Sequence, residues 1–214
     1  MRTDVSRRTA VRSLTMPRSE QLIRKISTLC FACSAAVVLV LGGFSFARAQ
    51  VSIVCFGQTV TISGTNNADS IPGTSGADVI ALGDGNDDTQ AHAGNDRVCG
   101  DDGGDDGLAG EGDNDWISGD QGDDAADGQA GCDNEVQGNS GDDSVWGSEC
   151  GDTVRGGPGS DGVDGGSGND ILYDGGGVDL VEGGPGDDVW NHCTDGSGDF
   201  YHGVEFINSG PGFC

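Results

Sequence analysis

The sequence has almost no positive charge beyond residue 49. Only Arg97 and Arg155, of ten lysines and arginines, lie in that part, whereas all but Asp4 and Glu20 of the 36 acidic residues do. This part of the chain therefore carries a formal net charge of −32. Phosphate backbones and anionic membrane surfaces repel such a chain. We exclude nucleic acid as a partner and expect no stable membrane insertion.

The same part of the chain is poor in the residues that build a thick core. Aromatic residues make up 6% of the sequence, and no long apolar run occurs after Phe46. A globular domain needs clustered apolar segments to bury enough surface. The 41 glycines come with five prolines and no Gly-X-Y period, which excludes collagen. We therefore expect a stack of small units instead of one globule.

Motifs of common enzymes are missing as well. The sequence contains no HExxH and no GxSxG, and without a lysine after residue 49 it has no P-loop lysine there. Matches to GxGxxG carry no weight in a chain so rich in glycine. We predict that the protein is not an enzyme and has no catalytic domain.

Residues 1–49 have the organisation of a secretory signal peptide. A basic segment is followed by an apolar run over residues 26–46 and by Ala47-Arg48-Ala49, a small-x-small site. We expect cleavage after Ala49 and a secreted, extracellular protein of bacterial type, with Met1 or Met16 as the start. The alternative is an uncleaved membrane anchor, because the apolar run is long enough to span a bilayer.

An aspartate recurs every nine residues over residues 64–191, with two steps of ten. Glycine usually stands two places before it and an aliphatic residue two places after it. The six positions rich in Gly, Asp and Asn predict a turn, and the three positions after the aspartate predict a very short strand. The aspartates of this register are Asp69, Asp78, Asp87, Asp96, Asp106, Asp115, Asp124, Asp133, Asp143, Asp152, Asp161, Asp170, Asp179 and Asp188.

The residue two places after each aspartate is expected to face inward. Glu135 is the exception, because a buried unpaired carboxylate is costly. The ten-residue step from Asp133 to Asp143 lies beside it, so a bulge that turns Val136 inward and Glu135 outward is plausible. The remaining inward residues are Ile71, Ile80, Thr89, Val98, Leu108, Ile117, Ala126, Val145, Val154, Val163, Leu172, Val181 and Trp190.

The turn composition predicts a cation site. Gly, Asn and Asp tolerate positive φ, so they bend the chain sharply and aim carbonyl oxygens at one point. Converging carbonyl and carboxylate oxygens in a flexible site favour Ca²⁺ over Mg²⁺. The cysteines form no CxxC pair outside the leader, so no soft-metal site is predicted. His192 and His202 are interpreted as exposed or hydrogen-bonded residues of a terminal cap.

Three segments carry the most complete motif: residues 156–161, 165–170 and 183–188. They resemble the GGxGxDxUx nonapeptide of RTX (repeats-in-toxin) proteins, and the resemblance covers residues 64–191. It implies an all-β fold, a parallel β-roll in which two nonapeptides form one turn and Ca²⁺ lies between stacked turns. It also implies that the fourteen aspartates supply carboxylate oxygens, while neighbouring turn residues supply backbone carbonyls.

Short segments at both ends are expected to close this roll. Residues 50–63 alternate like a strand, and we expect this N-terminal cap to join the first turn and cover its open end. Residues 192–214 concentrate aromatic residues and are expected to form the C-terminal cap. The predicted organisation is therefore a signal peptide (1–49), an N-terminal cap (50–63), a repeat domain (64–191) and a C-terminal cap (192–214).

Six cysteines remain after residue 49, an even number in a secreted chain, which favours disulfides. Cys132 and Cys150 are two nonapeptides apart, so a roll places them on adjacent turns. Cys193 and Cys214 flank the tail and are expected to close it, which leaves Cys55 with Cys99.

The sequence thus predicts a secreted calcium-binding repeat protein that folds on binding Ca²⁺ and acts as a structural or binding module. An extracellular adhesin or glycan-binding module stays open because of Trp116, Trp146 and Tyr173. An ice-binding protein needs a regular outward Thr/Asn array, and an RTX-type hydrolase needs catalytic machinery; neither is found. No protein or glycan partner can be named.

Overall fold

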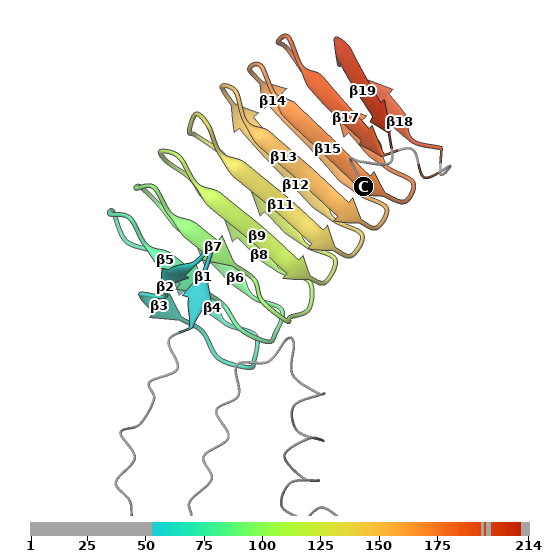
Figure 1. Ribbon diagram of the computed structural model, residues 1–214. Helices are drawn as coiled ribbons and strands as arrows, with labels where there is room; N and C mark the ends of the chain where they lie inside the picture. The colour runs from blue at the N-terminus through green and yellow to red at the C-terminus, as the bar shows by residue number, and fades with distance from the viewer. Residues whose placement is uncertain (1–52, 194, 196–197, 211–214) are drawn as a thin grey trace, which may run out of the picture. The chain divides into compact units, whose positions relative to one another are not determined.

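The computed structural model describes residues 53–193, 195 and 198–210, and all regular structure in this part is β (Figure 1). The chain winds into a parallel solenoid of about eight turns. Each turn crosses two sheets, one of eight strands and one of nine. The predicted all-β parallel β-roll is confirmed.

Strands with even numbers form the first sheet, and strands with odd numbers form the second. The even sheet contains β4 (Ser70–Pro72), β6 (Asp88–Gln90), β8 (Gly107–Ala109), β10 (Ala125–Asp127), β12 (Ser144–Glu149), β14 (Gly162–Ser167), β16 (Leu180–Glu182) and β18 (Phe200–His202). The odd sheet contains β3 (Ile62–Ser63), β5 (Val79–Ala81), β7 (Arg97–Cys99), β9 (Trp116–Gln121), β11 (Glu135–Ser140), β13 (Thr153–Pro158), β15 (Ile171–Gly176), β17 (Val189–Cys193) and β19 (Phe206–Gly210).

The pairing register follows the nonapeptide period. Val145 pairs with Val163, and Val163 pairs with Val181, so one turn takes two nonapeptides. Where the sequence makes a step of ten residues, the turn takes one residue more, and Thr89 pairs with Leu108. Each strand therefore keeps its inward residue stacked on that of the next turn.

A narrow file of side chains between the two sheets forms the core. The predicted inward residues from Ile80 to Trp190 are buried, apart from Glu135, and Ile71 is only half-buried near the N-terminal end. Leu82 and Ala91 are also fully buried, although they stand where the motif has its first glycine. Because each repeat contributes so little apolar surface, every turn depends on its neighbours for burial.

Glu135 does not face the core. Val136 is fully buried and pairs with Ile117 and Val154, whereas Glu135 lies on the outer face and accepts a hydrogen bond of 2.8 Å from Arg155. The inward turn of Val136 is thus confirmed. The burial of Val136 also means that the extra residue of the ten-residue step precedes Asn134. Asn134 therefore takes the register position expected for Asp133.

The N-terminal segment forms a hairpin on the outer face of the odd sheet. Strands β1 (Val54–Cys55) and β2 (Gln58–Thr59) pair antiparallel, and β1 contacts β5 and β7. The Phe56 ring meets the edge of Trp116, with ring centroids 5.6 Å apart. The hairpin therefore covers a face instead of the open end, and β3 is the edge strand there. The signal-peptide prediction falls on residues outside the described part.

The solenoid continues past Asn191, where the repeat motif ends. Strands β18 and β19 pair with β16 and β17 and add a further turn. The Tyr201 ring lies 4.8 Å from the Trp190 ring, and Val204 packs against the core. The tail thus extends both sheets, with β18 and β19 as their last strands (Figure 1).

Two of the three predicted disulfides are confirmed. Cys132 and Cys150 are bonded across adjacent turns with their Cα atoms 4.9 Å apart, and Cys55 is bonded to Cys99 with a Cα separation of 5.9 Å. The predicted partner of Cys193, Cys214, lies outside the described residues. Within the described part there is no helix, and hence none that is long and apolar enough to cross a membrane.

Candidate metal-binding turns

The register aspartates form two hydrogen-bonded ladders, one along each edge of the roll. In each ladder a side-chain oxygen, Oδ1 in most members, accepts the backbone N–H of the member one turn earlier, at 2.7–3.1 Å. One ladder precedes the even strands and contains Asp69, Asp87, Asp106, Asp124, Asp143, Asp161, Asp179 and Asp199. The other precedes the odd strands and contains Asp78, Asp96, Asp115, Asn134, Asp152, Asp170, Asp188 and Glu205.

The second oxygen of most ladder aspartates is buried without a hydrogen bond from the described residues. A buried carboxylate oxygen in this state is costly, because folding removes its water and supplies no donor in return. Either a proton or a cation must therefore compensate it. The Oδ2 atoms concerned belong to Asp87, Asp96, Asp106, Asp115, Asp124, Asp143, Asp152, Asp161, Asp170, Asp179 and Asp188.

The first glycine of each well-formed motif packs directly against this oxygen, so a side chain at that position would overlap it. A Cβ atom on Gly156 would lie 2.5 Å from Asp161 Oδ2 and 2.6 Å from the carbonyl oxygen of Asp174. The same holds for Gly165, where a Cβ would lie 2.6 Å from Asp170 Oδ2 and 2.8 Å from the carbonyl oxygen of Gly183. Carboxylate and carbonyl oxygens thus converge on a position that any side chain would fill. This all-oxygen donor set fits Ca²⁺.

Burial makes the ladder carboxylates weak acids. Desolvation, together with a smaller effect of neighbouring carboxylates, raises the pKa of Asp106, Asp115, Asp152 and Asp161 to about 7, against the lowering effect of the backbone N–H bond. The same causes raise the pKa of Asp143, Asp170 and Asp179 to about 6. They also raise the pKa of Asp96, Asp124 and Asp188 above the usual value. A divalent cation beside these oxygens favours their ionised form, which opposes the desolvation effect.

Thirteen of the fourteen predicted aspartates lie in the ladders, and Asp133 does not. Asp133 is exposed, whereas Asn134 is 1% exposed. The Oδ1 of Asn134 accepts the Asp115 N–H, and its buried Nδ2 has no hydrogen-bond partner among the described residues. The expectation for Asp133 is therefore corrected to Asn134. An amide offers no charge to a cation, so the odd ladder has one weak position.

The first member of each ladder also differs from the rest. Asp69 Oδ2 accepts hydrogen bonds from the N–H and the hydroxyl of Thr65, at 2.7 and 2.8 Å. Asp78 Oδ2 accepts the same pair from Thr74, at the same distances. These oxygens are already paired within their own turn, so the two aspartates are the poorest candidates for metal binding. Threonine four places before the aspartate is the sequence signal of this difference.

Sequence reasoning missed the last member of each ladder. Asp199 follows Asp179 by 20 residues, and its Oδ1 accepts the Asp179 N–H at 3.1 Å. Glu205 follows Asp188 by 17 residues, and its Oε2 accepts the Asp188 N–H at 2.9 Å. Neither spacing fits the nonapeptide period, so only the pairing of β18 and β19 identifies them.

We expect the metal-free protein to fold on acidification. The folded-state pKa values of about 6 to 7 exceed the unfolded value of about 3.9. This contribution to stability is therefore fully present below about pH 4 and is lost as the pH rises through 6 to 7. Circular dichroism in excess chelator checks this. A metal-free chain that gains β-structure as the pH rises from 4 to 8 would contradict the assignment.

We expect Gly156→Ala to weaken metal-dependent folding. The added methyl group overlaps Asp161 Oδ2 and the Asp174 carbonyl oxygen, so it should cost about 1–3 kcal/mol in the calcium-bound state. Gly162→Ala is the matched control on the adjacent repeat, because its nearest atom lies 3.9 Å from the new Cβ. Calcium-saturated chemical denaturation measures both, and equal losses would argue against a site at Gly156.

A comparison with protein-family models identifies the family of these repeats. Residues 63–98, 73–107, 133–163 and 163–189 match the RTX calcium-binding nonapeptide repeat, in four copies. The chain matches no curated protein. RTX nonapeptides bind Ca²⁺, and the buried aspartate oxygens of the repeat turns fit that ion. The protein is therefore a member of the RTX calcium-binding nonapeptide repeat proteins.

Proposed function

We propose that the protein is secreted, folds into its β-roll on binding Ca²⁺ and then acts as an extracellular structural or binding module. The observation that carries this proposal is the set of buried Oδ2 atoms without a partner along both edges. Their eleven aspartates are the proposed side-chain ligands, with carbonyl oxygens of the adjoining turns. Ca²⁺ supplies the charge that compensates these oxygens.

Charge repulsion supports the coupling between calcium and folding. Neighbouring strands in a sheet lie about 4.8 Å apart, so each ladder stacks carboxylates at roughly that spacing. The described part of the chain offers only Arg97 and Arg155 as basic residues besides histidine, and Arg155 bonds Glu135 on the outer face. At neutral pH the metal-free roll is therefore self-repelling. Ion binding supplies folding free energy in such a case.

Export is supported by the disulfides and by the leader. Cys55–Cys99 and Cys132–Cys150 tie the hairpin to the roll and one turn to the next, and such bonds persist in oxidising compartments. The basic and apolar character of residues 1–46, followed by Ala47-Arg48-Ala49, fits a cleaved signal peptide. Extracellular modules bind Ca²⁺ at roughly 10⁻⁴ to 10⁻³ M.

A glycan-binding or adhesin role is the second candidate, and the exposed aromatic rings are the observation behind it. Trp116 and Trp146 are 39% and 37% exposed. However, Arg97 lies over the Trp116 ring at 4.8 Å and Arg155 over the Tyr173 ring at 4.7 Å, so these two ring faces are already occupied. Trp146 lies on the even sheet, apart from this pair. The exposed aromatic side chains therefore favour a structural module over a glycan-binding surface.

We expect calcium to drive the folding of the processed protein at pH 8. In excess chelator the chain should be expanded, and β-structure should appear with a midpoint of roughly 10⁻⁴ to 10⁻³ M Ca²⁺. Circular dichroism and light scattering follow the transition, with Mg²⁺ at equal concentration as the control ion. A compact β-roll in chelator at this pH would rule out calcium-coupled folding.

We expect Asp106→Asn to affect calcium and proton responses in opposite directions. Asp106 is 3% exposed and its Oδ2 is unpartnered, so the amide should raise the calcium midpoint. In chelator it removes a buried charge, as Asn134 does naturally, and should move the acid-induced folding transition to higher pH. Calorimetric calcium titration and dichroism in chelator measure the two effects.

Asp105→Asn is the matched control, because Asp105 is the exposed neighbour and carries the same charge. It should shift both transitions much less than Asp106→Asn, because its charge acts on Asp106 and Asp124 only at a distance. Equal effects of the two substitutions would show that general relief of repulsion, and not the ladder position, is responsible.

A further inference from the structure

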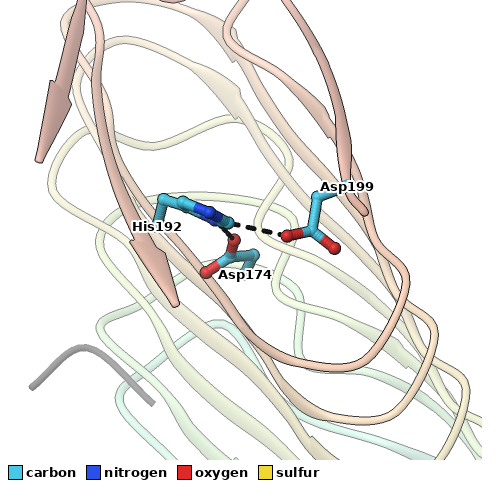
Figure 2. Close-up of side chains that lie close together, drawn as sticks. All are labelled: Asp174, His192 and Asp199. Atoms are coloured by element: carbon cyan, nitrogen blue, oxygen red, sulfur yellow. Dashed lines mark hydrogen bonds and ion pairs between the residues drawn. The ribbon is translucent and has the colours of Figure 1, made fainter. Parts of the chain in front are cut away.

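A cluster of three side chains near the C-terminal end differs from the calcium turns, because it contains an imidazole. Asp174 comes from β15, His192 from β17, and Asp199 directly precedes β18 (Figure 2). His192 Nδ1 lies 2.7 Å from Asp174 Oδ2 and 3.3 Å from Asp199 Oδ2. One ligand atom from each residue lies within 4.8 Å of the others. Asp174 stands where the motif has its first glycine.

Both carboxylates are held by backbone N–H groups. Asp174 is fully buried, and its Oδ1 accepts the N–H groups of Gly175 and Cys193, each at 2.8 Å. Asp199 Oδ1 accepts the Asp179 N–H at 3.1 Å. In each case one oxygen is anchored and the other faces the imidazole. Such outer hydrogen bonds orient metal ligands in proteins.

A buried acceptor without a partner lies close to this cluster. Asp179 is 1% exposed, and its Oδ2 receives no hydrogen bond from the described residues. The charges of Asp199 and Asp174 both act on the Asp179 carboxylate. Two carboxylates therefore contact one imidazole, and the Asp179 carboxylate lies within electrostatic range of both. A dication would compensate this charge.

We propose that Asp174, His192 and Asp199 form a site for a first-row transition metal, with Zn²⁺ as the best fit. Imidazole nitrogen suits Zn²⁺ better than Ca²⁺ or Mg²⁺, and carboxylate oxygens complete its common ligand set. Tetrahedral Zn²⁺ with bonds of about 2.0–2.1 Å separates its ligand atoms by roughly 3.3–3.4 Å. The observed separations of 2.7 and 3.3 Å need little adjustment. Three protein ligands leave a fourth position for water.

The site shares no residue with the eleven proposed calcium ligands, although Asp199 ends the even ladder. It goes beyond calcium-coupled folding, because it is specific for a nitrogen-preferring metal. A bound Zn²⁺ would join β15, β17 and the start of β18, and so hold the last turn on the roll.

His92 provides the matched control. Its Nδ1 lies 2.8 Å from Glu111 Oε2, but the two side chains are 43% and 34% exposed, and no third ligand is grouped with them among the described residues. It therefore reproduces the imidazole–carboxylate contact without the three-ligand cluster.

The test is a calorimetric titration of the processed, calcium-saturated protein with ZnCl₂. We expect one Zn²⁺ to bind, and His192→Gln, which keeps a hydrogen-bond donor but offers a poor metal ligand, to weaken binding at least about tenfold. Asp174→Asn should do the same, and His92→Gln should have no effect. Dichroism of each variant in Ca²⁺ verifies that the roll is folded.

Three outcomes would overturn the proposal. They are absence of saturable Zn²⁺ binding by the folded wild-type protein, an equal loss in His92→Gln, and complete displacement of Zn²⁺ by Ca²⁺. If His192→Gln does not fold, Co²⁺ is added to the wild-type protein and its visible absorption spectrum is recorded. An absorption band that Zn²⁺ abolishes supports the site, and absence of the band refutes it. Folding in Ca²⁺ is measured independently, so failure of the zinc site and failure of calcium-coupled folding are distinguishable.

Discussion

The hydrogen bond from a backbone N–H to the aspartate one turn later is the interaction on which the rest of the roll depends. It repeats along both edges and fixes the register of adjacent turns. It also draws the carboxylate out of water and leaves its second oxygen buried. One oxygen therefore joins the turns, while the other requires a cation or a proton. The hydrogen bond between turns and the proposed calcium ligand thus come from the same side chain, and Asn134 shows that an amide keeps the first without the charge of the second.

The narrow core explains why this dependence is tolerated. Each repeat buries essentially one aliphatic side chain, such as Val154 or Val163, and no turn covers its own apolar surface. Such a core offers too little burial to offset a row of uncompensated carboxylates at neutral pH. Other contacts stabilise the two ends of the roll, where a turn has a neighbour on one side only. The Cys55–Cys99 disulfide holds the hairpin near the first turns, and Tyr201 packs on Trp190 at the last turn. On the proposed function, ion binding therefore supplies part of the folding free energy at the turns whose Oδ2 atoms are buried.

Much of the fold follows from the nine-residue period, because periodicity determines which residues stack. It predicts stacked turns and short strands and thirteen of the ladder aspartates, whereas the parallel roll, and with it the Cys132–Cys150 bond between adjacent turns, is what the resemblance to RTX nonapeptides implies. The period does not decide between Asp133 and Asn134, since the extra residue can be inserted on either side of this pair. Burial decides, because Val136 packs in the core where Glu135 would place a charge. Asp199 and Glu205 lie off the period, and the hairpin position depends on long-range contacts that no local pattern encodes.

The central and the C-terminal turns of the roll share one hydrogen-bond pattern but differ in the conformational free energy that their backbones require. Apart from Phe56, every described non-glycine residue with positive φ lies between His92 and Cys150, where Asp101, Asp113 and Asp120 adopt φ values near 70°. A side chain in this region costs roughly 1–2 kcal/mol, although aspartate and asparagine tolerate it best. After Cys150 the corresponding positions are glycines, such as Gly157 and Gly166. The central turns therefore carry a conformational cost that the C-terminal turns avoid, and the contacts with neighbouring turns must offset it.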